Sequence, residues 1–287
     1  MSSNSSVALV LEGGGFRGMF TAGVLEVLLR EQIFFQEVIG VSAGAAYGVS
    51  YVSRQPGRNL VVNRFVNHPQ YCGWKHLFKH GSYFNWEFIY RTIPTQLLPF
   101  DYQAFARSSS RMTVVVSNID TGLPEYHRVT GSSFEEFRDW LTATSSLPII
   151  SPPKCIDGSR YMDGGLLDSI PVSQALGNGQ SRAVVVLTRP KGYRKRPPRF
   201  PALVRRCCRN YPLVADMLLN RARRYNQAVD QLEALEQAGT VFVIRPTFTM
   251  TVSRLDNHPR HLEALYHQAM EQMQKELPRL REWLGNC

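Results

Sequence analysis

A serine between two glycines, in the pattern GxSxG, stands at Gly40, Ser42 and Gly44. In this pattern the serine occupies a sharp turn between a strand and a helix, where its hydroxyl is exposed and the glycines leave room for a substrate. An apolar run precedes the turn and an alanine-rich run follows it, which fits a strand and a helix. Ser42 is therefore a candidate nucleophile, and the alternative is a tight turn that only packs a helix on a strand.

A second glycine-rich turn, Gly-Gly-Gly-Phe-Arg-Gly, contains Gly13, Gly14, Gly15 and Arg17. Successive glycines allow several backbone N–H groups to converge, and the helix that follows adds partial positive charge. Such a turn binds an anion, either a phosphate or the oxyanion of an acyl-transfer intermediate. No Gly-Lys-Ser/Thr follows as in a P-loop, and GxGxxG fits in its letters without a convincing acid after a second strand. A flexible turn without function is the alternative.

A carboxylate stands on a third glycine turn, Asp163-Gly164-Gly165. Asp-Gly is also common hairpin chemistry, and Asp157-Gly158 is predicted to be such a plain turn. Taken alone, Asp163 is not distinguished from a turn residue. The seven histidines contain no HExxH pattern, so we predict no metal site.

The elements that must hold these turns alternate between strands and helices. Short apolar runs predict strands, and helical spacing of apolar residues predicts helices. Predicted strands cover residues 7–11, 38–41, 113–117, 183–187 and 240–244, with a strand pair around Tyr126 and a short strand before Asp163; predicted helices cover residues 19–31, 134–143, 212–238 and 258–284, with another opening at residue 42. The aromatic-rich residues 59–99 are expected to form a cap or one wall of a groove. This order indicates an α/β fold with a mostly parallel sheet.

Length and composition favour one globular domain. The 287 residues are 44% hydrophobic and 20% charged, so we expect a single domain over residues 1–287, with core motifs in 7–187 and a basic segment and C-terminal helices in 188–287. No apolar run reaches about 18 residues and no signal peptide is evident. Five cysteines without a CxxC pair fit reduced thiols. We therefore expect a cytoplasmic protein.

The formal net charge of +10 is concentrated in one region. Between Arg189 and Arg224, twelve Lys and Arg residues face one acid, Asp216. We call residues 189–224 the basic segment. Such a segment fits nucleic acid, an anionic membrane surface or an acidic substrate, and the alternative is a solvated basic surface.

The sequence resembles the patatin-like phospholipases, and their bacterial cytoplasmic branch best, in the order of three motifs. These are GGGxRG, then GxSxG, then a proline-containing connection that ends in Asp-Gly-Gly. The resemblance covers about residues 7–187 and includes Thr-Ser-Ser-Leu-Pro at 144–148. It departs at Glu12, where many members have Asp. It implies a three-layer α/β/α fold with a mostly parallel central sheet, a lipid or ester substrate and no cofactor.

The resemblance also implies a role for each motif residue. Ser42 would be the nucleophile and Asp163 the base that accepts its proton directly. The N–H groups of Gly13, Gly14 and Gly15 would form the oxyanion hole, with Arg17 anchoring the loop. The remaining motif glycines would support the two turns: Gly40, Gly44, Gly164 and Gly165.

The favoured hypothesis is thus a lipid acyl hydrolase with an acyl groove at residues 71–90. Its basic segment would contact the anionic inner face of a membrane, and no nucleic acid is expected as a partner. A second hypothesis is an α/β-hydrolase esterase with a triad of Ser42, Asp163 and His258 or His261, whose chain order fits. However, only one clear strand precedes Ser42. A third is a basic module without enzymatic activity that binds nucleic acid or phosphate through the glycine loop.

Overall fold

Eight strands form one sheet within residues 4–285, the part of the chain that the computed structural model describes. Residues 1–3, Asn286 and Cys287, and with them the two ends of the predicted domain, lie outside the described residues. The strands are β1 (Asn4–Leu11), β2 (Phe35–Val41), β3 (Arg111–Asn118), β4 (Pro124–Val129), β5 (Lys154–Ile156), β6 (Ser159–Asp163), β7 (Arg182–Val186) and β8 (Val241–Ile244). Their order is β5-β6-β3-β2-β1-β7-β8, with β4 also paired to β3.

The sheet is parallel in its centre and antiparallel at one side. Strands β3, β2, β1, β7 and β8 pair in parallel, whereas β4, β5 and β6 form the antiparallel part. Parallel strands covered on both faces need apolar residues at successive positions. Residues 7–11 and 183–187 meet this need, which explains why the sequence showed them as continuous apolar runs.

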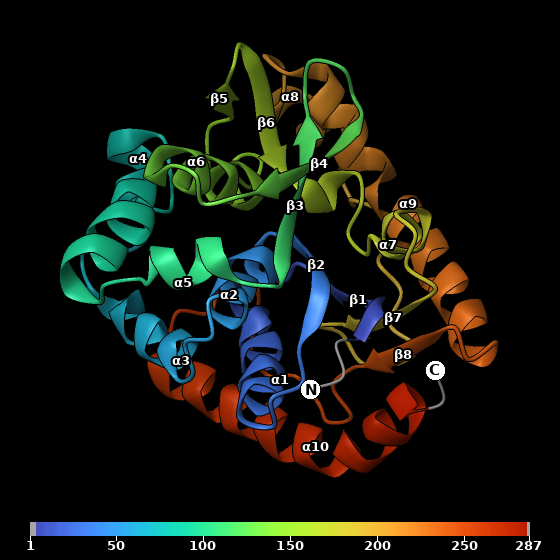
Figure 1. The fold of residues 1–287 in the computed structure, drawn as a ribbon. Coiled ribbons are helices and arrows are strands. Elements are labelled where there is room, and N and C mark those ends of the chain that lie inside the picture. Colours follow the sequence, from blue (N-terminus) through green and yellow to red (C-terminus); the bar gives the residue numbers. More distant parts are fainter. Residues whose placement is uncertain (1–3, 286–287) are drawn as a thin grey trace.

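Helices cover both faces of the sheet and complete three layers (Figure 1). Alternate residues of β1 pack into two separate clusters, Val7, Leu9 and Leu11 on one face, and Ala8 and Val10 on the other. The first face carries α1 (Met19–Arg30), α2 (Ala43–Val52), α6 (Phe134–Ser145) and α10 (Pro259–Gly285); the second carries α7 (Val172–Gly177) and α9 (Pro212–Gln237). The predicted mostly parallel, three-layer α/β/α fold is confirmed.

The aromatic-rich region forms a wall of short helices at the side of α2 (Figure 1). It contains α3 (Arg58–Asn63), η2 (Arg64–Asn67), α4 (Trp74–His80), the π-helix η3 (Phe88–Leu97) and α5 (Tyr102–Arg107). Three further short elements are η1 (Gly15–Gly18), η4 (Gly164–Leu166) and α8 (Pro201–Cys207). The sequence did not predict α7, α8 or β5, because each is too short to show a periodic pattern.

Two strands end against each other beside β3. Val41, the last residue of β2, pairs with Val115, and Asp163, the last residue of β6, pairs with the next residue, Val116. Because β2 is parallel to β3 and β6 is antiparallel to it, the carboxyl ends of β2 and β6 approach each other along the same edge of β3. Two candidate catalytic residues that are distant in sequence are thereby placed at one point of the sheet.

Candidate active site

Ser42 lies on the strained turn that the GxSxG pattern predicts. It joins β2 to α2 with φ 54° and ψ −123°, a conformation that few residues other than glycine adopt. Its backbone N–H donates to the hydroxyl of Thr144 at 2.9 Å, and that hydroxyl donates to the carbonyl of Val115 at 2.6 Å. A side chain at Gly44 would come within 2.5 Å of the carbonyl oxygen of Leu11, so only glycine allows α2 this close to β1.

Asp163 is buried at the end of β6, with 3% of its surface exposed. Its N–H donates to the carbonyl of Ser146, and its Oδ1 accepts the N–H of Gly165 at 2.7 Å. A side chain at Gly164 would lie 2.2 Å from the carbonyl oxygen of Val115. The Asp-Gly-Gly turn therefore packs directly on β3, unlike the turn at Asp157, which has nothing within 4 Å of its glycine. Asp157-Gly158 is the plain hairpin turn that was predicted, between β5 and β6.

Ser42 and Asp163 line the same cavity, although no hydrogen bond joins their side chains in the described structure. Catalytic hydrogen bonds are often long before the substrate binds. A second polar pair, the hydroxyls of Tyr90 and Ser145, which are 2.8 Å apart, lines a cavity together with Ser42. Burial raises the pKa of Tyr90, and the negative charge of Asp163 adds to this effect.

The glycine loop lies against Ser42, the candidate nucleophile. A side chain at Gly13 would come within 3.0 Å of Cβ of Ser42, and one at Gly14 within 2.7 Å of the Thr188 hydroxyl. The N–H groups of Gly13 and Gly14 donate to no other described residue. Gly40, the first glycine of the GxSxG turn, packs on the backbone of Ala45 in α2.

The acid that precedes the loop holds it in place. The buried carboxylate of Glu12 accepts the N–H and the hydroxyl of Thr188 at 2.6 and 3.2 Å, and so joins the end of β1 to the end of β7. On the other side, the N–H of Phe16 donates to the carbonyl of Arg254. Arg17 follows in η1, where it is buried, and its Nε has no hydrogen-bond partner among the described residues.

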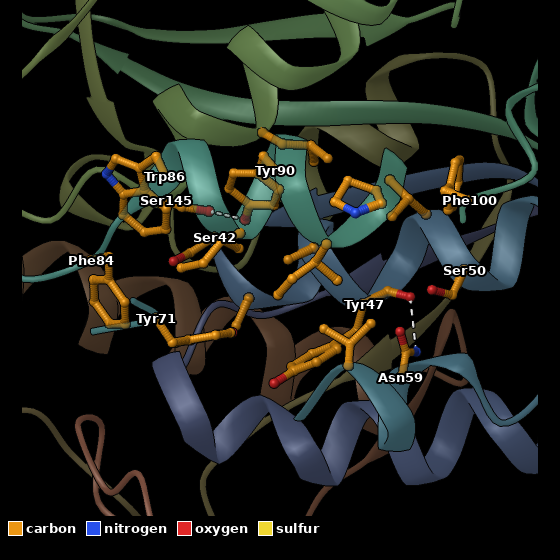
Figure 2. A pocket seen from close by; sticks show the side chains of 18 of the residues that line it. Ser42, Tyr47, Ser50, Asn59, Tyr71, Phe84, Trp86, Tyr90, Phe100 and Ser145 are labelled. Atoms are coloured by element: carbon orange, nitrogen blue, oxygen red, sulfur yellow. Dashed lines mark hydrogen bonds between the residues drawn. The ribbon is translucent and has the colours of Figure 1, made fainter. Parts of the chain in front are cut away.

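An apolar cavity of about 130 Å³ opens on one side of Ser42. Figure 2 shows aromatic side chains gathered around the serine, among them Tyr71, Phe84 and Trp86. Helix η3 contributes Ile89, Tyr90, Ile93 and Pro94 to its wall. The predicted groove at residues 71–90 thus faces the candidate nucleophile, but its wall continues to Phe100.

A polar cavity of about 640 Å³ opens on the other side of Ser42. Asp163 and the glycine loop line it together with six basic side chains: Arg17, Arg189, Lys195, Arg196, Arg221 and Arg254. We call this space the cationic chamber. Four of its six basic residues come from the basic segment, which the sequence analysis had assigned to a membrane surface.

The triad hypothesis depends on two exposed histidines. His258 and His261 precede and begin α10, with their rings 5.2 Å apart, and His261 contacts Asp256. Neither lines the cavities on either side of Ser42. Of the candidate bases Asp163, His258 and His261, Asp163 alone lines a cavity together with Ser42 in the described part of the chain.

A family model of the patatin-like phospholipases matches residues 9–176, so the chain belongs to this family. A second family model, a domain of unknown function, matches residues 211–285. Uncharacterized protein YjjU of Escherichia coli K12 is 30% identical over 190 residues, which are 64% of this chain and 52% of that protein. Lysophospholipase nte1 of Aspergillus oryzae is 26% identical over 265 residues, 84% of this chain and 16% of that protein.

The chain thus spans about half the length of one of these relatives and about a sixth of the other. Among solved structures, VipD from Legionella pneumophila matches with a TM-score of 0.44 and 14% identity, over 94% of this chain and 67% of that chain. No helix within residues 4–285 is both long and apolar enough to cross a membrane.

Proposed function

We propose that this protein hydrolyses carboxylic esters of lipids through a dyad of Ser42 and Asp163. Family membership and the lysophospholipase relatives support a lipid hydrolase. The observation that carries the dyad is the position of Ser42, which lies on a strained turn at the junction of an apolar cavity and a polar one that also contains Asp163. The lining of the first cavity suits an acyl chain, and that of the second suits the polar part of a lipid.

In the proposed reaction, Oγ of Ser42 attacks the ester carbonyl and Asp163 accepts the hydroxyl proton. The N–H groups of Gly13, Gly14 and Gly15 stabilise the negative charge on the carbonyl oxygen. The C–O bond to the leaving alcohol then breaks, and Asp163 returns the proton to that alcohol. Water attacks the acyl-Ser42 ester, Asp163 accepts its proton, and the fatty acid leaves as Ser42 regains its hydrogen.

A fluorophosphonate probe and a panel of phospholipids, lysophospholipids, acylglycerols and simple esters test this proposal. We expect the probe to label the wild-type protein but not Ser42→Ala, and hydrolysis to require the same serine. Equal labelling of both proteins would exclude Ser42 as the nucleophile.

We also propose a cytoplasmic location and a membrane contact of the basic segment through helix α8. Arg194 is paired with Asp230 and Glu233, so it is not a free surface charge. Helix α8 buries none of its residues, and Phe200 and Leu203 are 61% and 56% exposed among arginines at its ends. Exposed apolar side chains beside basic ones suit the surface of an anionic membrane.

A further inference from the structure

The cationic chamber holds far more positive than negative charge. Its six basic side chains face two acids, Glu12 and Asp163, and none of the six forms an ion pair with an acid among the described residues. The carboxylate of Glu12 is engaged by Thr188. Like charges gathered in a confined space repel each other, so this arrangement destabilises the folded protein when no anion is bound in the chamber.

Arg17 shows this destabilisation most directly. Its side chain is 6% exposed, it lines the chamber, and its Nε is buried without a hydrogen-bond partner. Burial, together with the charges of Arg189 and Arg254, lowers the pKa of Arg17 to about 10. A buried guanidinium with a free donor normally has an anion beside it. The chamber therefore has the donor set of an anion site.

Lys195 is held in the chamber by its backbone. Its N–H donates to Oδ1 of Asn226 at 2.8 Å, and its carbonyl accepts Nδ2 of the same residue at 3.1 Å. Its ammonium lies 3.9 Å from the centre of the Tyr225 ring. Burial and the nearby Arg221 lower the pKa of Lys195 to about 6. Two hydrogen bonds with Asn226 of α9 thus hold Lys195 in a place where its positive charge is disfavoured unless an anion is bound.

Arg221 connects the chamber to the catalytic turn. Its Nε donates to the carbonyl of Gly165 at 2.6 Å, two residues after Asp163. A group bound to the guanidinium of Arg221 is consequently close to the candidate base. The chamber also shares Gly15, Ser42 and Leu147 with the apolar cavity, so a molecule that reaches into both cavities passes over the nucleophile.

Resting on the proposed lipid hydrolysis, we propose that the cationic chamber is a head-group site for a phosphate monoester. The preferred substrate is a lipid whose phosphate carries no cationic substituent. Such a phosphate has up to two negative charges and accepts several hydrogen bonds from arginine and lysine. A choline or ethanolamine head group would bring a further cation beside the five arginines of the chamber, and like charges at close range select against it.

The test compares two lipids with one acyl chain, 1-oleoyl lysophosphatidate and 1-oleoyl lysophosphatidylcholine. We expect wild-type kcat/KM to favour the monoester by roughly 10-fold or more, the effect of one charge-assisted hydrogen bond. Lys195→Met should raise KM for the monoester and remove most of this preference. Lys191→Met is the matched control, because Lys191 is an exposed lysine of the same segment outside the chamber.

Binding to the inactive Ser42→Ala variant separates the head group from the chemistry. Calorimetry should show that this variant binds lysophosphatidate, and that glycerol 3-phosphate competes weakly, with both affinities reduced by Lys195→Met. Equal rates on the two lipids, or a preference unchanged by Lys195→Met, would overturn the proposal. Tight binding of glycerol 3-phosphate without hydrolysis of any lipid would refute the proposed function and reassign the chamber to free phosphate monoesters. No binding of either probe would refute the head-group site alone.

Discussion

The backbone N–H of Ser42 donates to the hydroxyl of Thr144, which is fully buried and lies 102 residues further along the chain. The same hydroxyl donates to Val115 of β3. One side chain therefore holds the strained turn of Ser42 against the strand beside which Asp163 ends. We predict that Thr144 positions the candidate nucleophile without contacting the substrate.

Thr144→Val removes the hydroxyl while keeping the shape of the side chain. We expect it to leave two buried backbone groups unpaired, at about 1–3 kcal/mol each, and to lower kcat more than it raises KM. Thr144→Ser restores the hydroxyl and should recover most of kcat. The measurement is steady-state hydrolysis of a short-chain ester, with melting curves of both variants. Loss of stability with an unchanged kcat would show that the bond serves folding only.

Asp163 is predicted to be the base, without help from a histidine. Asp163→Asn should lower kcat by on the order of 10²-fold or more, because the amide cannot accept the proton of Ser42. His258→Ala and His261→Ala should retain near wild-type rates, since both side chains lie outside the two cavities at Ser42. A comparable loss at either histidine would favour the triad instead.

Gly14→Ala should displace the glycine loop. Its new Cβ would come within 2.7 Å of the Thr188 hydroxyl, which Glu12 holds from the other side. We expect a loss in kcat of roughly 10²–10³, the effect of losing one oxyanion donor. Gly177→Ala is the matched control, because nothing lies within 4 Å of the added carbon. An active Gly14→Ala protein would argue against this role of the loop.

Lys195→Met should make the empty protein more stable at neutral pH. The pKa of Lys195 is about 6 in the folded chain, below its ordinary 10.5, with Arg221, Arg254, Arg17 and Glu12 facing it. Between these two values the unfolded chain binds a proton that the folded chain lacks, so the wild type gains stability as pH rises towards 10.5. Because the side chain is only partly buried, solvent screens part of this effect. We therefore expect Lys195→Met to raise Tm by about 2–4 °C at pH 7.

The pH dependence distinguishes this explanation from a simple gain in packing. The difference in Tm between Lys195→Met and the wild type should shrink as pH rises towards 10. A difference that stays constant from pH 7 to pH 10 would contradict the assigned pKa. The same variant is predicted to lose phosphate binding, so the substitution would raise stability and impair function.

Membrane binding through α8 is predicted to depend on apolar side chains as well as charge. Replacing Phe200 and Leu203 with serine should weaken binding to anionic vesicles, and raised salt should weaken it further. Hydrolysis of a soluble short-chain ester checks that the site is intact. Leu97→Ser is the control, because Leu97 is also exposed but belongs to η3. Binding that ignores both changes would leave α8 as ordinary surface.

The sequence revealed those parts of the site that are contiguous in the chain. The turn at Ser42 and the glycine loop at Gly13 each carry a complete local signal, and the alternation of elements was sufficient for the α/β fold. Asp163 has no such signal, because its position depends on the register of β6 against β3. It was identified through the family resemblance alone.

The cationic chamber could not be predicted for a similar reason. Lys195 belongs to a run of basic residues that looks like a solvated surface, and contacts with Tyr225 and Asn226 on α9 place it in a cavity. Arg254 comes from the connection between β8 and α10, where it meets the glycine loop through its backbone carbonyl. The number of charged residues in a segment does not show which of their side chains lie together in the folded protein.

The central position of β1 has a consequence for how the chain unfolds. Its neighbours in the sheet are β2, which lies in the segment matched by the patatin-like model (residues 9–176), and β7, which follows that segment. Helix α1 also packs closely on α10, because a side chain at Gly23 would lie 2.3 Å from the carbonyl oxygen of Tyr266. A fragment that ends at residue 176 would expose β1 as an edge strand and uncover α1. We therefore expect both matched segments to unfold in one cooperative transition, and the isolated first segment to aggregate or to be degraded rapidly by proteases.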